Sequence, residues 1–471
     1  MKNTEKRLAA LGAAVPELLL PVPEIDLSQW AVIACDQFTQ DKGYWEKVRS
    51  AAGDSASTFN LIYPEAYLEE ADRERRIAAI HQTMKRYLTA GIFSPPQKTL
   101  VYVERDTPLH QSRRGLILSL DLETYDWKSQ DGNTAAALLI RPTEGTVTER
   151  LPARMDVRRG APLETPHILV LINDENNTLL PALGERAKRD TPLYSTELML
   201  GSGRLRGWKL DSKDDWSFLA EGLEQLANNS PTSSTTAGGS DKPAAPFLYA
   251  VGDGNHSLAT AKSVWEEYKM AHQNDPDLMN HPARWALVEL ENLYDPALSF
   301  EPIHRLLFGT EIAAVQQLLM ALPGYICRSL DSPDEQNNQE ELSLLVQDEH
   351  CGKLRLGLVS GGQYFLIEAD PTPLAVDVLQ PLLDKFITDQ NGKVSIDYIH
   401  GSNDVIRLAA GETTAGEAAG AGNAVVGILL PPFRKQGLFK TIARHGPLPR
   451  KSFSMGESCE KRFYLECRKL F

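Results

Sequence analysis

Polar residues able to hold a phosphate follow one short apolar segment. Residues 248–251 are Leu, Tyr, Ala and Val, a composition typical of a strand, and residues 252–257 are Gly, Asp, Gly, Asn, His and Ser. Apolar residues at helical spacing from Leu258 to Tyr268 then predict a helix. The first N–H groups of a helix have no partner inside it and carry the positive end of its dipole. A glycine turn that opens a helix is therefore predicted to bind phosphate.

The side chains of this turn divide into two expected roles. Asp253 and His256 are candidates for catalysis, and Asp253 is also the candidate ligand for Mg²⁺. The residues expected to hold the phosphates are Gly252, Gly254, Asn255 and Ser257. The structural alternative is a capped turn, in which Asp253 or Asn255 accepts helix N–H groups and His256 is only a polar surface residue. The sequence leaves both interpretations open.

Phosphoryl transfer to an alcohol needs further groups, which other segments could supply. It requires cations that neutralise the developing charge and a carboxylate or histidine within reach of the hydroxyl. Asp36 lies in the apolar segment 30–38, predicted as a strand, and Glu144 follows another predicted strand at 135–141. Both are candidates for the base, although Asp36 could instead cap a turn and Glu144 could pair with Arg141. The other groups expected to contact the ligand are Arg141, His304, Arg305, His400 and Lys451.

The central turn and five further segments resemble a known family. DGNHS at 253–257 is similar to the D-G-H-H-R box of ParB-type nucleotide-binding domains, sulfiredoxins and free-serine kinases. The chain as a whole is identified as a member of the domain-of-unknown-function family 1015. The matching segments, in the order of that family, are AVIACDQFTQDKGYW, IRPTEGT, VGDGNHSLATA, FEPIHRLLF, IDYIHG and GPLPRKSFSMGE.

Two residues of the turn depart from the box. Asn255 stands where the family has its first His and sulfiredoxins have a reactive Cys, which excludes sulfiredoxin chemistry there. Ser257 stands where Arg is usual, and this removes a forked set of donors suited to phosphate. A substitute cation could come from the densest basic segment of the chain, which contains Arg150, Arg154, Arg158 and Arg159.

The resemblance implies a small-molecule phosphotransferase. The most specific version of this hypothesis is a free-serine kinase-like enzyme that uses Mg²⁺. Its phosphate donor would be ATP, ADP or pyrophosphate, and its acceptor a small hydroxyl compound. The alternative is a nucleotide-binding regulatory protein of the ParB type without catalysis. A metal-dependent hydrolase ranks third, because the sequence has no H-x-x-x-H or H-x-H pair.

Composition limits the partners and the compartment. A net charge of -14 is unfavourable for a nucleic-acid surface, which needs clustered Lys and Arg. The sequence has no apolar run near the roughly eighteen residues that a membrane span needs. Five widely spaced cysteines favour a reduced cytoplasm. We therefore expect a cytoplasmic protein that binds a small molecule and neither nucleic acid nor membrane, and homodimer formation stays open.

The alternation of predicted strands and helices favours an α+β fold. We expect a mixed sheet flanked by helices, with a ParB/sulfiredoxin-like element, and a smaller C-terminal α+β domain. The expected divisions are an N-terminal arm at 1–20, a main domain at 21–295 and a C-terminal domain at 296–471. Residues 228–246 are of low complexity and are expected to form a mobile linker, and 342–347 are expected to form a strand.

Overall fold

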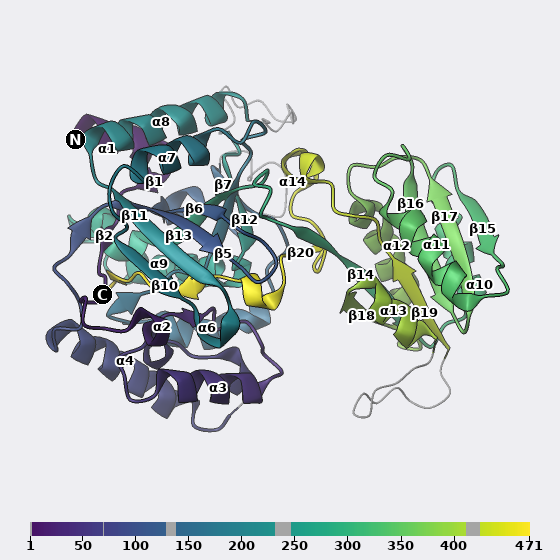
Figure 1. Ribbon diagram of the computed structural model, residues 1–471, viewed down its shortest axis with the longest axis horizontal. Helices are drawn as coiled ribbons and strands as arrows, with labels where there is room; N and C mark the ends of the chain where they lie inside the picture. The colour runs from purple at the N-terminus through teal and green to yellow at the C-terminus, as the bar shows by residue number, and fades with distance from the viewer. Residues whose placement is uncertain (1, 69, 129–137, 231–245, 411–423) are drawn as a thin grey trace. The chain divides into compact units, whose positions relative to one another are not determined.

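The computed structural model describes residues 2–68, 70–128, 138–230, 246–410 and 424–471 (Figure 1). Residues 231–245, most of the expected linker, lie outside the described residues. The chain divides into two compact units. Unit 1 comprises Met1–Leu298, Ala443–Pro447 and Gly456–Phe471, and unit 2 comprises Ser299–Ile442 and Leu448–Met455. The domain boundaries expected from the sequence stay predictions, because compactness does not show which parts fold independently.

A mixed nine-stranded sheet forms the centre of unit 1. Its order is β10-β11-β5-β6-β13-β9-β12-β7, and β1 also pairs with β6. The β13–β9 and β12–β7 pairs are parallel, and the other pairs are antiparallel. The strands are β1 (Ala13–Ala14), β5 (Leu100–Asp106), β6 (Arg113–Asp121), β7 (Ile140–Pro142), β9 (Leu169–Ile172), β10 (Tyr194–Glu197), β11 (Arg204–Leu210), β12 (Tyr249–Asp253) and β13 (Trp285–Asn292). The predicted mixed sheet is confirmed.

Helices cover this sheet on both sides. In Figure 1, α1, α7 and α8 lie on one side and α3, α4 and α6 on the other, and α7 contacts β5, β6 and β11. The helices of unit 1 are α1 (Lys2–Ala10), α2 (Leu27–Trp30), α3 (Lys42–Ala52), α4 (Arg73–Thr89), α6 (Leu151–Arg158), α7 (Leu179–Ala187), α8 (Lys213–Asn228) and α9 (Asn255–Ala271). Sequence signals explain α8: Ser212 caps its first turn, and Trp216, Leu219 and Leu223 form its buried face.

The end of the chain, residues 456–471, is built into unit 1 and is called the tail. Its short strands β21 (Phe463–Tyr464) and β22 (Arg468–Lys469) pair with β3 (Val32–Ile33) and β8 (Leu163–Glu164). A separate two-stranded pair joins β2 (Glu17–Leu18) to β4 (Gln97–Lys98). The prediction of a strand over the whole of 30–38 is wrong, since only two of its residues pair and the chain turns at Asp36.

Unit 2 is an antiparallel seven-stranded sheet with helices. Its order is β15-β17-β16-β19-β14-β18, and β20 also pairs with β14. The strands are β14 (Phe300–Phe308), β15 (Ile326–Leu330), β16 (Leu354–Ser360), β17 (Gln363–Ala369), β18 (Ser395–His400), β19 (Val425–Leu429) and β20 (Phe453–Met455). The helices are α10 (Ile312–Leu319), α11 (Glu335–Gln347), α12 (Ala375–Asp389), α13 (Ser402–Ala409) and α14 (Leu438–His445), the last of which crosses the division between the units. The α+β fold class is thereby confirmed.

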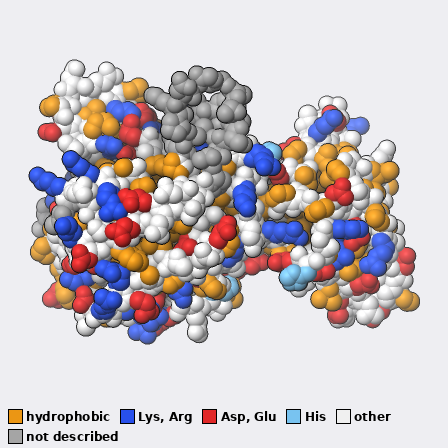
Figure 2. Space-filling model, turned by 90° about the horizontal axis from the view of Figure 1, so that it is seen from above, with side chains coloured by type: hydrophobic (Ala, Val, Ile, Leu, Met, Phe, Trp, Pro, Cys, Tyr) orange, Lys and Arg blue, Asp and Glu red, His pale blue; other side chains and the backbone are white. Residues whose placement is uncertain are grey.

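One face of the molecule shows how its charged side chains are distributed. Figure 2 shows acidic and basic side chains interspersed on the face it displays. Among the described residues, none of the helices is both long enough and apolar enough to cross a membrane. The expected cytoplasmic location and the expected partners stay predictions.

Candidate functional site

The turn between β12 and α9 has the geometry expected from the sequence. Gly254 has φ +80°, in the left-handed region, and it directly precedes the first residue of α9. A Cβ atom at Gly254 would lie 3.2 Å from both Cα and Cγ1 of Ile168, so the position favours glycine on two grounds. The N–H of Gly254 donates to Asp253 Oδ1 over 2.9 Å, and no side chain of the described residues caps α9. The predicted strand, turn and helix are confirmed, whereas phosphate binding stays a prediction.

A lysine of the tail provides a cation at this turn. Lys461 Nζ lies 3.1 Å from Asp253 Oδ2, and the two side chains are 9% and 24% exposed. A lysine ammonium beside the start of a helix adds to the positive end of the helix dipole. No local pattern predicts this contact, because the tail follows unit 2 in the chain.

Three of the four arginines in the basic segment that follows Glu144 pair with carboxylates. Arg154 pairs with Glu65, and Arg158 Nη2 lies 2.6 Å from Glu164 Oε1. Arg159 forms a two-point contact with the Glu267 carboxylate over 2.7 and 2.9 Å. Arg154, Arg158 and Arg159 therefore have carboxylate partners within the protein, and Lys461 is a cation that contacts the turn itself.

The loop at 143–147 runs beside the turn and carries Glu144. Asn255 Nδ2 donates to Thr143 Oγ1 over 3.4 Å, and the N–H of Val147 donates to His256 Nε2 over 3.1 Å. His256 Nε2 is thus an acceptor, which places the proton of a neutral ring on Nδ1. Asn255 Oδ1 is buried with no hydrogen-bond partner among the described residues. Glu144 is half-buried in this loop, so the structure brings Glu144, Asn255 and His256 into one region.

A second line of polar contacts begins at Ser257. Its Oγ lies 2.7 Å from His167 Nε2, and His167 Nδ1 lies 2.9 Å from the hydroxyl of Tyr464 in the tail. The Tyr464 hydroxyl also accepts the N–H of Cys35 over 3.1 Å. Asp36 Oδ2 lies 3.8 Å from His167 Nε2. Of the predicted residues, Asp36 and Ser257 are thus brought together, through a histidine and a tyrosine that the sequence analysis missed.

A cavity of about 150 Å³ adjoins this line of contacts. Ser257, His167 and Tyr464 are among the residues that line it, and Thr165 contributes a buried Oγ1 with no hydrogen-bond partner among the described residues. The other lining residues are mostly apolar and include Leu61, Ile62, Tyr63, Met84, Val157 and Leu163. The cavity is large enough for a small organic molecule with a few polar groups, the usual character of a ligand site.

Arg141 is buried in β7, next to β12 in the sheet. Its register partner is Ala250, and its guanidinium carbon lies 4.8 Å from the ring centroid of Phe247. Only 3% of Arg141 is exposed, and burial lowers the pKa of its guanidinium. Its Nε and Nη2 have no hydrogen-bond partner among the described residues. The structure therefore keeps Arg141 near the strand that leads to the turn, and its contact with a ligand stays a prediction.

Four predicted ligand contacts belong to unit 2 and are not placed relative to the turn. His304 Nδ1 accepts the N–H of Leu430 over 3.0 Å, and burial lowers the pKa of His304 to about 4, with a further contribution from Arg305. Arg305 is fully buried, and its Nε donates to Gln380 Oε1 over 2.8 Å. Within unit 2, His304 and Arg305 have structural partners. The other two residues are His400 and Lys451.

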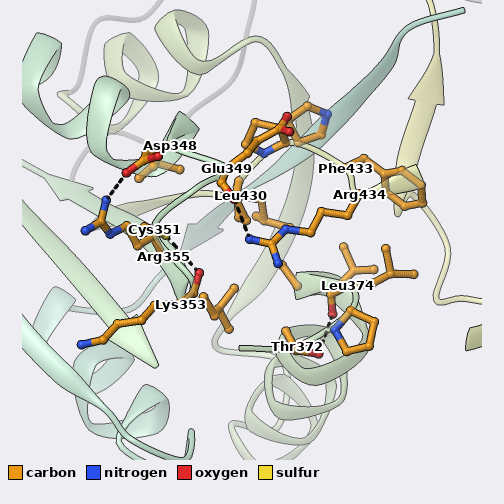
Figure 3. Close-up of a pocket in the computed structure, with 18 of the residues that line it drawn as sticks. Asp348, Glu349, Cys351, Lys353, Arg355, Thr372, Leu374, Leu430, Phe433 and Arg434 are labelled. Atoms are coloured by element: carbon orange, nitrogen blue, oxygen red, sulfur yellow. Dashed lines mark hydrogen bonds and ion pairs between the residues drawn. The ribbon is translucent and has the colours of Figure 1, made fainter. Parts of the chain in front are cut away.

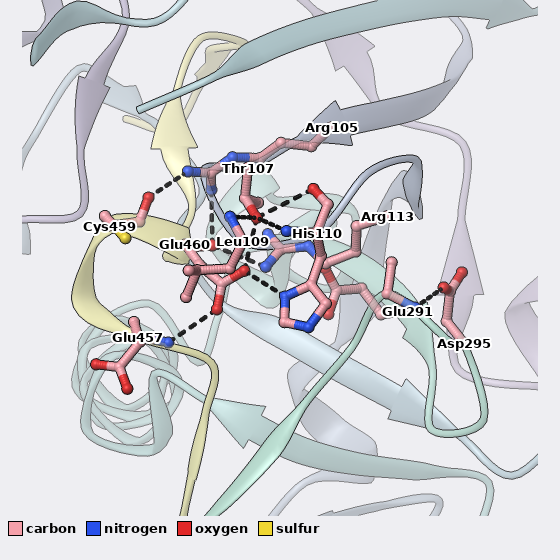
Figure 4. A network of polar contacts seen from close by, with 11 residues as sticks. Arg105, Thr107, Leu109, His110, Arg113, Glu291, Asp295, Glu457, Cys459 and Glu460 are labelled. Carbon is pink, nitrogen blue, oxygen red and sulfur yellow. Dashed lines mark hydrogen bonds and ion pairs between the residues drawn. The ribbon is translucent and has the colours of Figure 1, made fainter. Parts of the chain in front are cut away.

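A layer of buried charges holds the tail against the sheet of unit 1 (Figure 4). Arg113 Nε lies 3.0 Å from Glu291 Oε1, and Arg462 Nη1 lies 2.9 Å from Glu289 Oε2. Arg105 donates to the backbone carbonyl of Cys459 over 2.7 Å. Burial raises the pKa of Glu291 to about 7 and lowers the pKa of Arg105 to about 9. Because the tail carries Lys461 and Tyr464, this layer sets the position of both side chains at the site.

The turn does not fit a resident magnesium ion well. Asp253 Oδ1 accepts an N–H and Oδ2 faces the Lys461 ammonium, so a divalent cation would have to displace a positive charge. The described residues contain no group of three or more His, Cys, Asp or Glu side chains arranged to hold a metal. A magnesium ion often keeps several waters and uses only one or two carboxylates together with substrate phosphates. Binding of Mg²⁺ by Asp253 stays a prediction.

Unit 2 contains a smaller cavity of about 30 Å³, which Figure 3 shows. Its arginines already have partners: Arg355 pairs with Asp348 and Glu368 over 3.1 and 2.8 Å, and Arg434 donates to the carbonyl of Glu349. A space of this size suits a water molecule rather than a nucleotide. The cavity beside Ser257 is therefore the better candidate for a substrate.

Comparison with known proteins identifies a family. The family model described as "Protein of unknown function (DUF1015)" matches residues 19–385. No match is found among curated proteins.

Solved structures show only distant similarity. A free serine kinase variant in complex with AMP matches 75% of this chain and 92% of its own, with 11% identity and a TM-score of 0.35. A conserved hypothetical protein from Pyrococcus furiosus matches 75% and 97%, with 12% identity and a TM-score of 0.31. The C-terminally truncated SbnI from Staphylococcus aureus matches 72% and 82%, with 8% identity and a TM-score of 0.31. Scores this low carry no conclusion about function.

Proposed function

The chain belongs to the DUF1015 family, and on that premise we propose that it is a small-molecule phosphotransferase of the kinase type. In this proposal the donor phosphates bind at the turn Asp253–Ser257, and an alcohol enters the cavity beside Ser257. The observation that carries the proposal is the combination at Gly254 of a left-handed glycine, the uncapped start of a 17-residue helix and the ammonium of Lys461. Backbone N–H groups and a nearby cation are the components from which phosphate sites are built.

Side chains around the turn support its proposed role in binding phosphate. Asn255 Oδ1 is buried with no partner among the described residues, although buried polar atoms normally have one. If the Asn255 amide were rotated, it would present its NH₂ group, a phosphate donor, at the same place. Lys461 could move from Asp253 to a phosphate oxygen, because both are anionic acceptors for its ammonium.

The proposed site has a donor half at the turn Asp253–Ser257 and an acceptor half at the cavity beside Ser257. Distances between atoms indicate which residues act in each half. Asp36 lies 3.8 Å from His167, which lines the cavity, and Asp36 is therefore better placed than Glu144 to act as the base. Glu144 lies in the loop bonded to Asn255 and His256, on the donor half of the site. We assign His256 to orienting that loop, since its Nε2 already accepts the Val147 N–H. The donor is proposed to be ATP, ADP or pyrophosphate, brought with Mg²⁺.

A nucleotide-responsive regulatory protein is the second candidate. The observation that favours it is the tail itself, which returns to unit 1 after unit 2 and places Lys461 on Asp253. A phosphate that drew Lys461 away from Asp253 would change a contact of the tail. Such a protein would bind nucleotide without turning it over.

A thermal-shift screen separates these proposals. The chain is heated with ATP, ADP, CTP or pyrophosphate, each with Mg²⁺, with and without serine, and product formation is followed in parallel. Stabilisation by a donor together with a phosphorylated alcohol supports the phosphotransferase. Stabilisation without turnover supports the regulatory protein, and no stabilisation by any donor refutes both.

Two variants test whether the donor stabilises the protein by binding at the turn. Asp253→Lys should abolish stabilisation by the donor if the turn is the site. The matched control is Asp211→Lys, since Asp211 also pairs with a lysine, Lys209, over 3.0 Å but does so at the surface. A full response in Asp253→Lys would place the donor elsewhere.

A further inference from the structure

Ser257 has the surroundings of an activated nucleophile. Its Oγ lies 2.7 Å from His167 Nε2, within the range at which a histidine can take a proton from a hydroxyl. Both side chains line the cavity of about 150 Å³, so a reactant could reach the hydroxyl. The other serine of α9 does not share this arrangement, because Ser263 Oγ donates to the carbonyl of Ala259 in the preceding turn.

The groups behind His167 can hold it in the tautomer that such a role needs. The Tyr464 oxygen lies 2.9 Å from Nδ1, and the Cys35 N–H fixes this oxygen from the other side. With its proton on Nδ1, the ring donates to Tyr464 and leaves Nε2 to accept from Ser257. Asp36 Oδ2, 3.8 Å from Nε2, would stabilise the imidazolium that forms when Nε2 takes the proton. Nucleophile, base and orienting group are thus present in order.

We propose that Ser257 receives the phosphoryl group before the acceptor does, so that the transfer proceeds through a phosphoserine on the protein. This inference rests on the proposed function. Ser257 Oγ forms a bond to the terminal phosphorus of the donor while His167 Nε2 takes the hydroxyl proton. The bond from that phosphorus to the bridging oxygen breaks, and ADP leaves when ATP is the donor. In the second step the acceptor oxygen attacks the phosphorus, Ser257 leaves and recovers a proton from His167, and the acceptor proton passes to Asp36.

The position of Ser257 favours the phosphorylated form. It is the third residue of α9, and a phosphate in the first turn of a helix is stabilised by the helix dipole. In the boxes that this turn resembles, an arginine stands at this position, and its side chain can bind phosphate. The serine of this chain can instead be phosphorylated. His167 is the catalytic base in this step, and Tyr464 is a positioning residue.

Mass spectrometry of the full chain tests the proposal. The protein is incubated with ATP, ADP or pyrophosphate and Mg²⁺ in the absence of acceptor, quenched, digested and mapped. We expect one phosphoryl group on Ser257 and none in Ser257→Ala, whereas the control Ser263→Ala should be labelled like the natural sequence. His167→Gln should slow labelling by about 10²- to 10⁴-fold, the usual contribution of a general base. Tyr464→Phe should be labelled more slowly and with a shifted pH profile, which a purely structural role would not produce.

Two results would overturn the inference, and they are distinguishable from failure of the proposed function. If a phosphorylated alcohol forms but Ser257 is never labelled and Ser257→Ala keeps its turnover, transfer is direct and the inference is wrong. If labelling occurs at another residue, Ser257 is not the nucleophile. If the chain neither binds nor consumes any donor, the proposed function fails and the inference fails with it.

Discussion

Replacement of Gly254 by alanine tests whether the turn is built for a close backbone approach. At φ +80° an alanine costs about 1–2 kcal/mol relative to the right-handed conformation. Its Cβ would also lie 3.2 Å from two atoms of Ile168, and overpacking of this kind costs a further 1–3 kcal/mol, roughly. We therefore expect Gly254→Ala to lower the free energy of unfolding of unit 1 by about 2–5 kcal/mol.

Gly160→Ala is the matched control in the same unit. Gly160 has φ +64°, and a Cβ there would meet no atom within 4 Å. This variant has the backbone cost alone, about 1–2 kcal/mol. The difference between the two variants in the loss of unfolding free energy gives the cost of the contact with Ile168.

Urea unfolding followed by tryptophan fluorescence measures both losses in unit 1. All seven tryptophans of the chain precede residue 299, so their emission reports unit 1 alone. The same variants are then heated with the donor, and we expect Gly160→Ala to keep its stabilisation and Gly254→Ala to lose most of it. Equal losses of stability, together with an unchanged donor response in Gly254→Ala, would refute the reasoning about the turn.

Three further predictions concern charged residues. Lys461→Met should weaken donor binding at least tenfold in calorimetry, since a hydrogen bond to a charged group contributes about 1.5–3 kcal/mol, whereas Lys209→Met should leave it unchanged. Arg462→Met leaves Glu289 buried without its ion pair and should lower stability by about 3–5 kcal/mol in urea, and a loss below about 1 kcal/mol would contradict this. Burial raises the pKa of Glu291 from 4.5 to about 7, so the folded state binds this proton more tightly than the unfolded state, and stability should fall as pH rises between these values. Glu291→Gln should remove that part of the pH dependence, and an unchanged stability profile would show that Glu291 is ionised throughout.

Local patterns were sufficient to predict the strand, turn and helix on which the proposed donor site lies. The apolar segment before Gly252 and the spacing of Leu258, Val264 and Trp265 predict β12 and α9, and both are found. Glycine at 254 follows from the left-handed turn between them. These features depend on residues that are neighbours in the sequence, and periodicity detects such features well.

A local pattern also failed in unit 2. Residues 342–347 were expected to form a strand but belong to α11. Leu342 and Val346 are buried and lie four residues apart, which is helical spacing, and the alternation typical of a strand is absent. The apolar run was too short for its period to be recognised from composition alone.

The other half of the site could not be predicted because its partners are distant in sequence. Tyr464 and Cys35 are 429 residues apart, and His167 is 90 residues from Ser257. No spacing rule connects such pairs: the pairing of β21 with β3 brings Tyr464 to Cys35, and the pairing of β12 with β9 brings His167 to Ser257. The same holds for Lys461, whose approach to Asp253 depends on the buried charges around Arg462.

The return of the tail to unit 1 has a consequence for biosynthesis. Residues 456–471 leave the ribosome after all of unit 2, yet β3 and β8 of unit 1 need them as partner strands. Domains generally fold as units during synthesis, with the N-terminal one first. Unit 1 therefore cannot complete its strand pairing before residues 456–471 have been synthesised. We expect nascent chains that have reached only Met455 to expose the unpaired edges of β3 and β8, and we expect chaperones to bind them until synthesis is complete.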